Sequence, residues 1–131
     1  MASPTPGVPR HIIVADEDRA AVAFIITTLR EEGHAVFHAY DALAAGQLAM
    51  AIEQIDLVIS NTKVEGADGV EVIAQLRRAR PEVPILYLAN DGRSTPELER
   101  QLPADVPILR EPFTAEKLRA AVDKLLDGKA K

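Results

Sequence analysis

Acidic and amide side chains stand directly after two short apolar runs of this chain. The run "HIIVA" is followed by Asp16, Glu17 and Asp18, and the run "DLVIS" is followed by Asn61. Neighbouring carboxylates can hold a divalent cation, because hard cations prefer oxygen ligands. An amide at such a place is neutral and a poor nucleophile. The question is therefore what Asn61 can do beside these acids.

The acids at 16–18 allow two interpretations. Asp16 and Glu17 could form a metal pair for Mg²⁺ or another divalent cation, although Mg²⁺ usually has a further carboxylate or a phosphate in its shell. Asp18 is expected to cap the helix that follows, because an aspartate can accept hydrogen bonds from the first free backbone N–H groups. Asn61 is expected to donate and accept hydrogen bonds that stabilise its loop.

No arrangement typical of a catalytic site is visible in the sequence. His11, His34 and His38 lack the spacing of metal ligands, and no serine, histidine and acid converge on the predicted loops. The chain has no cysteine, which excludes disulfides and thiol chemistry. No catalytic residue is therefore predicted, and the chain is not expected to be an enzyme.

Short apolar runs alternate with helical patterns along the chain, which indicates an α/β fold. The predicted strands are "HIIVA", "AVFHAY", "DLVIS", "PILYLA" and "VPIL". The last is expected at a sheet edge, because Pro107 cannot donate a backbone hydrogen bond. This alternation predicts a five-stranded parallel sheet with helices on both faces. Helices are predicted after Asp18, over "ALAAGQLAMAIEQ", after Asp68, from Pro96 to Pro103, and after Thr114.

Functional groups of parallel α/β folds gather at the carboxyl ends of the strands. The fold prediction therefore brings four separate pieces of sequence to one rim. These pieces are the acids at 16–18, Asn61, Ala89 with Asn90, and Glu111.

The rim is expected to be acidic. Asp16, Glu17 and Glu111 give it a charge of about -3 by formal count, and like charges at close range raise a carboxyl pKa or recruit a cation. Arg110 precedes Glu111, but alternation along the strand should point it to the other face. If the strand ends early, Arg110 could instead pair with the acids.

The bulk composition is that of one globular domain. The 131 residues are 47% hydrophobic and 27% charged, and the net charge of -5 argues against nucleic-acid binding by this domain alone. No apolar run approaches the roughly 20 residues that cross a bilayer, and no secretory signal is visible, so a cytoplasmic location is expected. We expect a flexible tail at residues 1–9, one domain at 10–127 and a frayed end at 128–131.

Three landmarks resemble the receiver domain of response regulators in two-component signalling. "VADED" resembles the acidic cluster after the first strand, "VEGADG" the loop before the third helix, and "REPFT" the Lys-Pro-Phe turn before the last helix. The resemblance covers the whole chain after the first residues. It implies a flavodoxin-like (βα)5 fold with strand order 2-1-3-4-5.

The resemblance also implies roles for individual residues. Two acids after the first strand hold Mg²⁺ in that family, and they are kept here as Asp16 and Glu17. The backbone carbonyl that would also face the metal belongs to Lys63.

The other three roles of the family are lost. Asn61 stands where an aspartate accepts the phosphoryl group, Ala89 where a Thr or Ser bonds it, and Glu111 where a Lys pairs with it. A neutral amide cannot form an acyl phosphate, alanine has no hydroxyl, and an anion would repel phosphoryl oxygens. The resemblance is therefore to a degenerate receiver, or pseudo-receiver.

The leading hypothesis is a protein-interaction module in signal transduction, without phosphorylation at Asn61. The resemblance implies protein partners, such as a histidine kinase, an output domain or another signalling protein, or a second copy in a homodimer. The partner face is expected to include Leu98, Leu102 and Pro107.

Three alternatives stay open. The acidic rim could bind a divalent cation and switch without phosphate, or the domain could be a conventional phosphorylated regulator. A flavodoxin-like redox carrier is disfavoured, because the first loop is acidic and would repel a phosphate, and aromatic residues are only 4% of the chain.

Overall fold

Five parallel strands form the central sheet of the protein. The computed structural model describes residues 9–90 and 92–130. The strands of the sheet are β1 (His11–Ala15), β2 (Ala35–Ala39), β3 (Leu57–Asn61), β6 (Ile85–Ala89) and β7 (Ile108–Arg110). They lie in the order β2-β1-β3-β6-β7, and every neighbouring pair is parallel. The predicted fold class and strand order are confirmed, and Pro107 directly precedes the edge strand.

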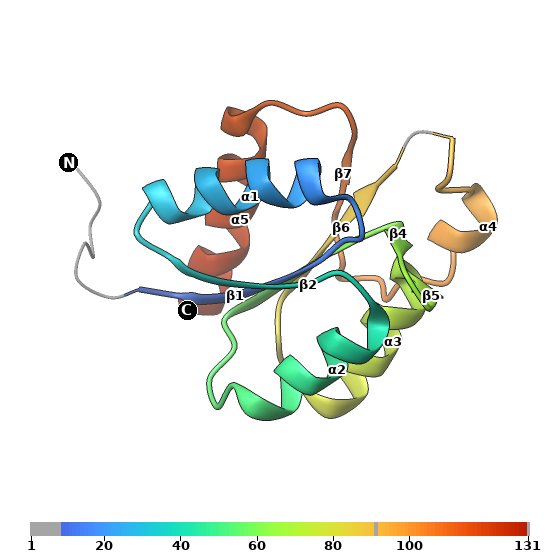
Figure 1. Cartoon of the computed structure of the whole chain (residues 1–131), viewed down its shortest axis with the longest axis horizontal. Helices are drawn as coiled ribbons and strands as arrows, with labels where there is room; N and C mark the ends of the chain where they lie inside the picture. Colours follow the sequence, from blue (N-terminus) through green and yellow to red (C-terminus); the bar gives the residue numbers. More distant parts are fainter. Residues whose placement is uncertain (1–8, 91, 131) are drawn as a thin grey trace.

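Helices cover both faces of this sheet (Figure 1). One face carries α1 (Arg19–Glu31) and α5 (Ala115–Ala130), and the other carries α2 (Ala42–Ala51) and α3 (Gly69–Ala79). The short helix α4 (Pro96–Glu99) lies beyond the carboxyl end of β6.

Alternation along the strands builds a core on each face of the sheet. Ile12 and Val14 pack in the cluster that contains the buried residues of α1 and α5. Ile13 and Ala15 pack in the cluster that contains those of α2 and α3. Successive side chains of a strand point to opposite faces, so the continuous apolar run "HIIVA" serves both cores.

Short polar side chains cap three helices at the predicted positions. The side chains of Asp18, Asp68 and Thr114 accept hydrogen bonds from backbone N–H groups two or three residues later. These bonds satisfy donors that have no partner within the helix.

Two helices are shorter than predicted. α2 ends at Ala51 instead of continuing to residue 54, and the Arg80 guanidinium donates to Ala49 and to two carbonyl oxygens just after the helix. α4 has only 4 residues, followed by turns up to Pro103. The Arg80 guanidinium thus satisfies carbonyl oxygens at the end of α2 that a further helical turn would otherwise satisfy.

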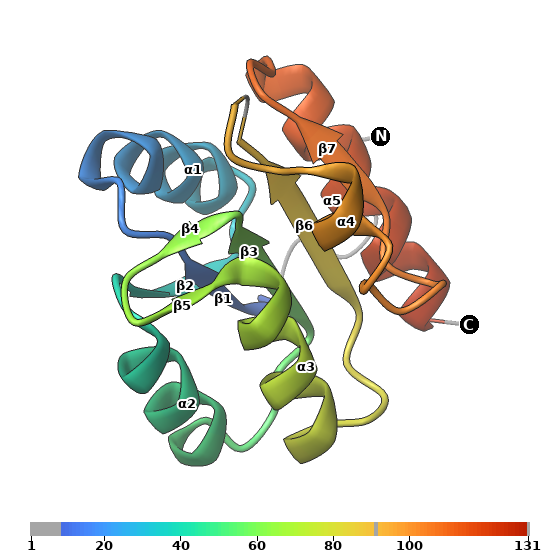
Figure 2. The same cartoon turned by 90° about the vertical axis from the view of Figure 1, so that its right-hand side faces the viewer.

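The predicted loop after β3 contains a small antiparallel hairpin, β4 (Lys63–Val64) and β5 (Ala67–Asp68). It lies in front of the carboxyl ends of the strands (Figure 2). Gly66 has a φ of 91° at its turn, a conformation that glycine adopts without steric cost. An ideal Cβ on Gly69 would lie 1.8 Å from the carbonyl oxygen of Asn61, so only glycine allows this close approach.

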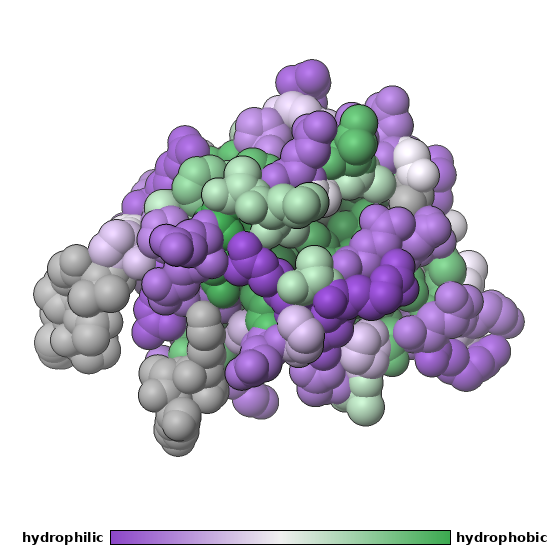
Figure 3. Space-filling model, turned by 90° about the horizontal axis from the view of Figure 1, so that it is seen from below, coloured by the Kyte–Doolittle hydropathy of each residue, from purple (hydrophilic) through white to green (hydrophobic). Residues whose placement is uncertain are grey.

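The outer surface of α2 is apolar. The helix contains no charged residue, and its side chains Leu43 and Met50 are 72% and 86% exposed. Figure 3, which views the molecule from the side of α2 and α3, shows apolar side chains gathered among hydrophilic ones. Within the described ranges, no helix is long and apolar enough to cross a membrane.

The predicted ends of the domain stay predictions. Residues 1–8 of the expected tail and residue 131 lie outside the described residues, while α5 extends to Ala130.

Candidate functional site

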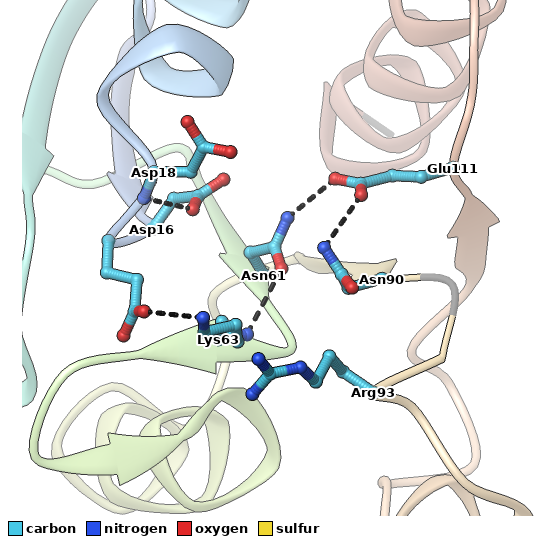
Figure 4. Close-up of a pocket in the computed structure, with 8 residues that line it drawn as sticks. Asp16, Asp18, Asn61, Lys63, Asn90, Arg93 and Glu111 are labelled. Atoms are coloured by element: carbon cyan, nitrogen blue, oxygen red, sulfur yellow. Dashed lines mark hydrogen bonds and ion pairs between the residues drawn. The ribbon is translucent and has the colours of Figure 1, made fainter.

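The predicted rim residues converge on one pocket of about 300 Å³ at the carboxyl ends of the strands (Figure 4). The residues that line it are Asp16, Glu17, Asp18, Asn61, Lys63, Asn90, Arg93 and Glu111. Ala89 does not line the pocket. It is the buried last residue of β6, and its carbonyl oxygen accepts the Glu111 N–H at 3.0 Å.

Asn61 uses both ends of its amide. Its Nδ2 donates to Glu111 Oε2 at 2.8 Å, and its Oδ1 accepts the Lys63 N–H at 3.1 Å. The side chain is 2% exposed, so these bonds replace those that water would make. The predicted structural role of Asn61 is confirmed, and the amide joins the end of β3 to the loop after β7.

Glu111 accepts hydrogen bonds from two amides. Besides Asn61, the Asn90 Nδ2 donates to its Oε1 at 3.0 Å. No basic side chain of the described residues forms an ion pair with Glu111. Both oxygens of the Glu111 carboxyl group are thus hydrogen-bonded to neutral amides.

Asp16 is almost completely buried beside this contact, with 1% exposed. Its Oδ1 accepts the Asp18 N–H at 2.9 Å, but its Oδ2 has no hydrogen-bond partner in the described part of the chain. Burial raises the pKa of Asp16 to about 7, and the charges of Glu111 and Asp18 add to the rise. The expected effect of like charges on a rim carboxyl is present, with burial as the larger cause.

Glu17 and Lys63 form an ion pair, with Lys63 Nζ 3.0 Å from Glu17 Oε2. Lys63 therefore holds its side chain at the pocket through this ion pair. The Lys63 carbonyl, predicted to face a metal, instead accepts the Glu17 N–H at 3.1 Å. Two of the three groups implied for Mg²⁺, the Glu17 carboxylate and the Lys63 carbonyl, are thus each engaged with another group.

These residues do not fit a divalent cation in the arrangement observed. Asp16 Oδ2 is an unpartnered carboxylate oxygen at the pocket, whereas the Glu17 carboxylate is neutralised by Lys63. Among the described residues, no three His, Cys, Asp or Glu side chains come together as a metal site. Mg²⁺ would need such oxygen ligands or several waters.

Arg110 points away from the acids of the rim. It pairs with Glu99 of α4, with Arg110 Nη2 2.6 Å from Glu99 Oε1, and this bond lowers the pKa of Glu99. Strand β7 extends through Arg110, so the alternation of side chains places Arg110 on the face opposite to the rim acids, as expected. The alternative, in which the strand ends early and Arg110 pairs with those acids, does not occur.

A chain of buried hydroxyls runs beside the pocket toward α4. Thr62 Oγ1 lies 2.8 Å from the Tyr87 hydroxyl, which lies 2.8 Å from Ser94 Oγ, and Ser94 donates to Glu99 at 2.7 Å. The Asn90 N–H donates to Thr62 Oγ1 at 2.9 Å. No local sequence signal indicates this chain of hydroxyls, because its members lie far apart in the sequence.

The expected partner face is only partly exposed. Leu98 and Leu102 are half-buried and pack against the core next to α3, so they add little exposed apolar surface, and the partner face stays a prediction. Pro107 is exposed, and Ile108 beside it is 38% exposed.

Comparisons with known proteins agree with this fold. Residues 12–123 match the family described as "Response regulator receiver domain". The chain is 25% identical over 122 residues to the transcriptional regulatory protein GlrR of Escherichia coli (strain K12), covering 93% of this chain and 27% of that protein.

Solved structures show the same architecture. The response regulator receiver protein from Sinorhizobium medicae WSM419 has a TM-score of 0.81 at 26% identity, covering 91% of this chain and 95% of that one. The signal receiver domain of an HD domain-containing protein from Pseudomonas fluorescens Pf-5 has a TM-score of 0.85 at 20% identity, covering 99% and 96%.

The chain therefore belongs to the response regulator receiver domain family, the receiver module of two-component signalling. It spans about a quarter of the length of the curated relatives that it matches, the regulatory proteins GlrR and QseF of Escherichia coli.

Proposed function

We propose that this receiver domain is a degenerate one, which binds a signalling protein and is not phosphorylated at Asn61. It acts as a binding module and not as an enzyme. Its partner is a histidine kinase, an output domain or another signalling protein. The three changed positions, Asn61, Ala89 and Glu111, remove the nucleophile, the hydroxyl and the cation that phosphorylation uses.

One contact carries this proposal: the hydrogen bond from Asn61 Nδ2 to Glu111 Oε2, 2.8 Å long. The residue at the phosphoacceptor position is a donor here, and its partner is an anion. A phosphoryl group on this residue would meet the Glu111 carboxylate at close range, where like charges repel. The contact also ties β3 to the loop before α5, which supports a surface with one fixed shape.

Acetyl phosphate tests the proposal directly. The protein is incubated with acetyl phosphate and Mg²⁺, and its intact mass is measured beside that of an Asn61→Asp variant. We expect no adduct on the unaltered protein and none on the variant, because Ala89 and Glu111 still disable the site. The combined variant Asn61→Asp/Ala89→Thr/Glu111→Lys is the control that should gain a phosphoryl group. A base-labile phosphoryl adduct on the unaltered protein would establish a conventional regulator.

A second candidate is a switch that responds to a divalent cation at the acidic rim. The unpartnered Oδ2 of buried Asp16 favours it, and the ion pair between Glu17 and Lys63 opposes it. Isothermal titration with Mg²⁺, Ca²⁺ or Mn²⁺ decides between the two. Heat and thermal stabilisation at millimolar metal, both lost in Asp16→Asn, would favour the cation switch.

A further inference from the structure

A second pocket, of about 420 Å³, continues the acidic one toward α1 and α5. Both pockets are lined by Asp18, Asn90 and Glu111, so these residues stand at the junction. The far wall of the second pocket contains Phe24 and Phe113. The two pockets therefore form one continuous groove with an acidic end and an aromatic end.

The acidic end has carboxylates that lack a cation. Asp16 Oδ2 is buried without a partner among the described residues, and Glu111 accepts only from neutral amides. Figure 4 shows Asp16 and Asp18 on one side of the pocket and Glu111 across from them. The basic residues Lys63 and Arg93 lie at the opposite end of the pocket, and Lys63 is already paired.

The aromatic end exposes apolar surface. Phe24 is 42% exposed although it belongs to α1, a helix whose other large apolar side chains face the core. Its ring lies 6.2 Å from that of Phe113, measured between centroids. An aromatic pair at the surface offers a site for an apolar side chain from another molecule.

We propose that this groove binds a segment of a partner protein that carries an arginine or lysine next to an apolar residue. The basic side chain enters between Asp18 and Glu111 and reaches the buried Asp16, and the apolar side chain packs on Phe24 and Phe113. The inference rests on the proposed function and names the chemistry of the partner. Charge complementarity supports it, because the groove presents three carboxylates without an ion-pair partner in the described residues, and the chain carries a net charge of -5. A basic side chain fits this groove better than a metal ion does, because it needs fewer fixed ligands. Nucleic acids and anionic membranes are disfavoured as partners, because an acidic groove repels them.

The test is an NMR titration of the ¹⁵N-labelled protein with the dipeptide Ac-Phe-Arg-NH₂, in buffer with EDTA. We expect saturable shifts at the side-chain amides of Asn61 and Asn90 and at the backbone amides of Asp18 and Phe113. The matched dipeptides Ac-Phe-Gln-NH₂ and Ac-Ala-Arg-NH₂ should bind at least tenfold more weakly. Equal binding of all three dipeptides, or shifts at other sites only, would overturn the proposal.

Protein variants test each end of the groove separately. Asp16→Asn and Glu111→Gln should weaken Ac-Phe-Arg-NH₂ at least fivefold, and so should the exposed-surface variant Phe24→Ser. The controls Glu82→Gln and Leu43→Ser change an exposed acid and an exposed apolar residue elsewhere and should bind as the unaltered protein does. Binding that is unchanged in the three groove variants would refute the assignment.

Two outcomes separate this inference from its alternatives. Concentration-dependent shifts of the groove signals without dipeptide would show that a second copy occupies it and would overturn the proposal. Failure of the dipeptide, with no acetyl phosphate adduct, removes only the groove assignment. An adduct at Asn61 overturns the proposed function, whatever the titration shows.

Discussion

Asn61 donates a hydrogen bond to Glu111 across the carboxyl edge of the sheet, with 2.8 Å between Nδ2 and Oε2. In ordinary receivers, which this chain resembles, an aspartate at the position of Asn61 would face a lysine at the position of Glu111. Here the donor and acceptor have exchanged places, because the strand now supplies the donor and the loop supplies the anion. The contact between the two elements is kept, and we propose that the chemistry of phosphoryl transfer is lost.

Asn61→Asp is expected to destabilise the protein by about 1–3 kcal/mol at pH 8, because two carboxylates would meet where a hydrogen bond now forms. Urea unfolding measures the change. Adding Glu111→Lys to this variant should recover much of the loss, since the pair then has opposite charges. An Asn61→Asp variant as stable as the unaltered protein would contradict the importance of this contact.

Asp16 is expected to make the protein less stable as pH rises from about 4 toward 7. Its pKa is 3.8 when unfolded and about 7 in the folded state, so over this range only the folded state keeps the proton. The free energy of unfolding then falls with pH, by up to about 1.4 kcal/mol per pH unit. Urea unfolding at pH 5.5, 6.5 and 7.5 measures the slope.

Asp16→Asn should flatten that slope. Asp105→Asn is the matched control, because the hydrogen bond from Arg77 lowers the pKa of Asp105 and its titration lies at more acidic pH. The same pH slope in Asp16→Asn and in the unaltered protein would show that another group is responsible.

Two glycine-to-alanine changes should have opposite effects. Gly69→Ala places a Cβ 1.8 Å from the Asn61 carbonyl oxygen and should cost more than about 3 kcal/mol, or prevent folding. Gly46→Ala in α2 meets no atom within 4 Å and should stabilise by about 0.5–1 kcal/mol. Thermal unfolding of the two variants, followed by circular dichroism, makes the comparison. Similar effects of the two changes would contradict the close approach at Gly69.

Tyr87→Phe is expected to destabilise by about 1–2 kcal/mol, because it removes the hydroxyl between Thr62 and Ser94 and leaves buried polar groups with fewer partners. Tyr40→Phe is the control, since the Tyr40 ring contacts Arg19 and its hydroxyl has no bond to the described residues. Chemical denaturation of both proteins should show a loss for Tyr87→Phe alone.

Arg80→Ala should destabilise by about 1–3 kcal/mol, because the guanidinium satisfies three carbonyl oxygens at and just after the end of α2. Arg78→Ala removes an exposed arginine two positions earlier and should change stability by less than about 0.5 kcal/mol. Equal losses in the two variants would point to a general effect of charge instead of this contact.

The sequence predicted the architecture because its signals are local. Apolar runs, caps such as Asp18 and the "REPFT" turn each act over a few residues, and β-α alternation then restricts the topology. The rim was predictable for the same reason, since strand ends meet at one edge. The partners of each rim side chain were not predictable. Lys63 could be solvated or paired, and the choice depends on where Glu17 lies after folding.

The partial burial of Leu98 in α4 illustrates a second limit. A helix of 4 residues has too few turns for an apolar periodicity to show which side faces the core. The exposure of Phe24 was not predicted for a related reason, because Phe24 fits the apolar face of α1 by spacing and only the tertiary structure leaves it partly uncovered.

The hydroxyl chain beside the pocket has a fixed polarity. The Glu99 carboxylate can only accept, so Ser94 donates to it, and the Tyr87 hydroxyl must then donate to Ser94. Thr62 receives the Asn90 N–H, and its own hydroxyl lies within hydrogen-bond distance of both the Tyr87 hydroxyl and the Leu88 carbonyl oxygen. Because the O–H dipoles of Tyr87 and Ser94 both point toward Glu99, losing the negative charge of that one carboxylate would free these two hydroxyls to reverse, and Thr62 next to the end of β3 would sense a change made at α4.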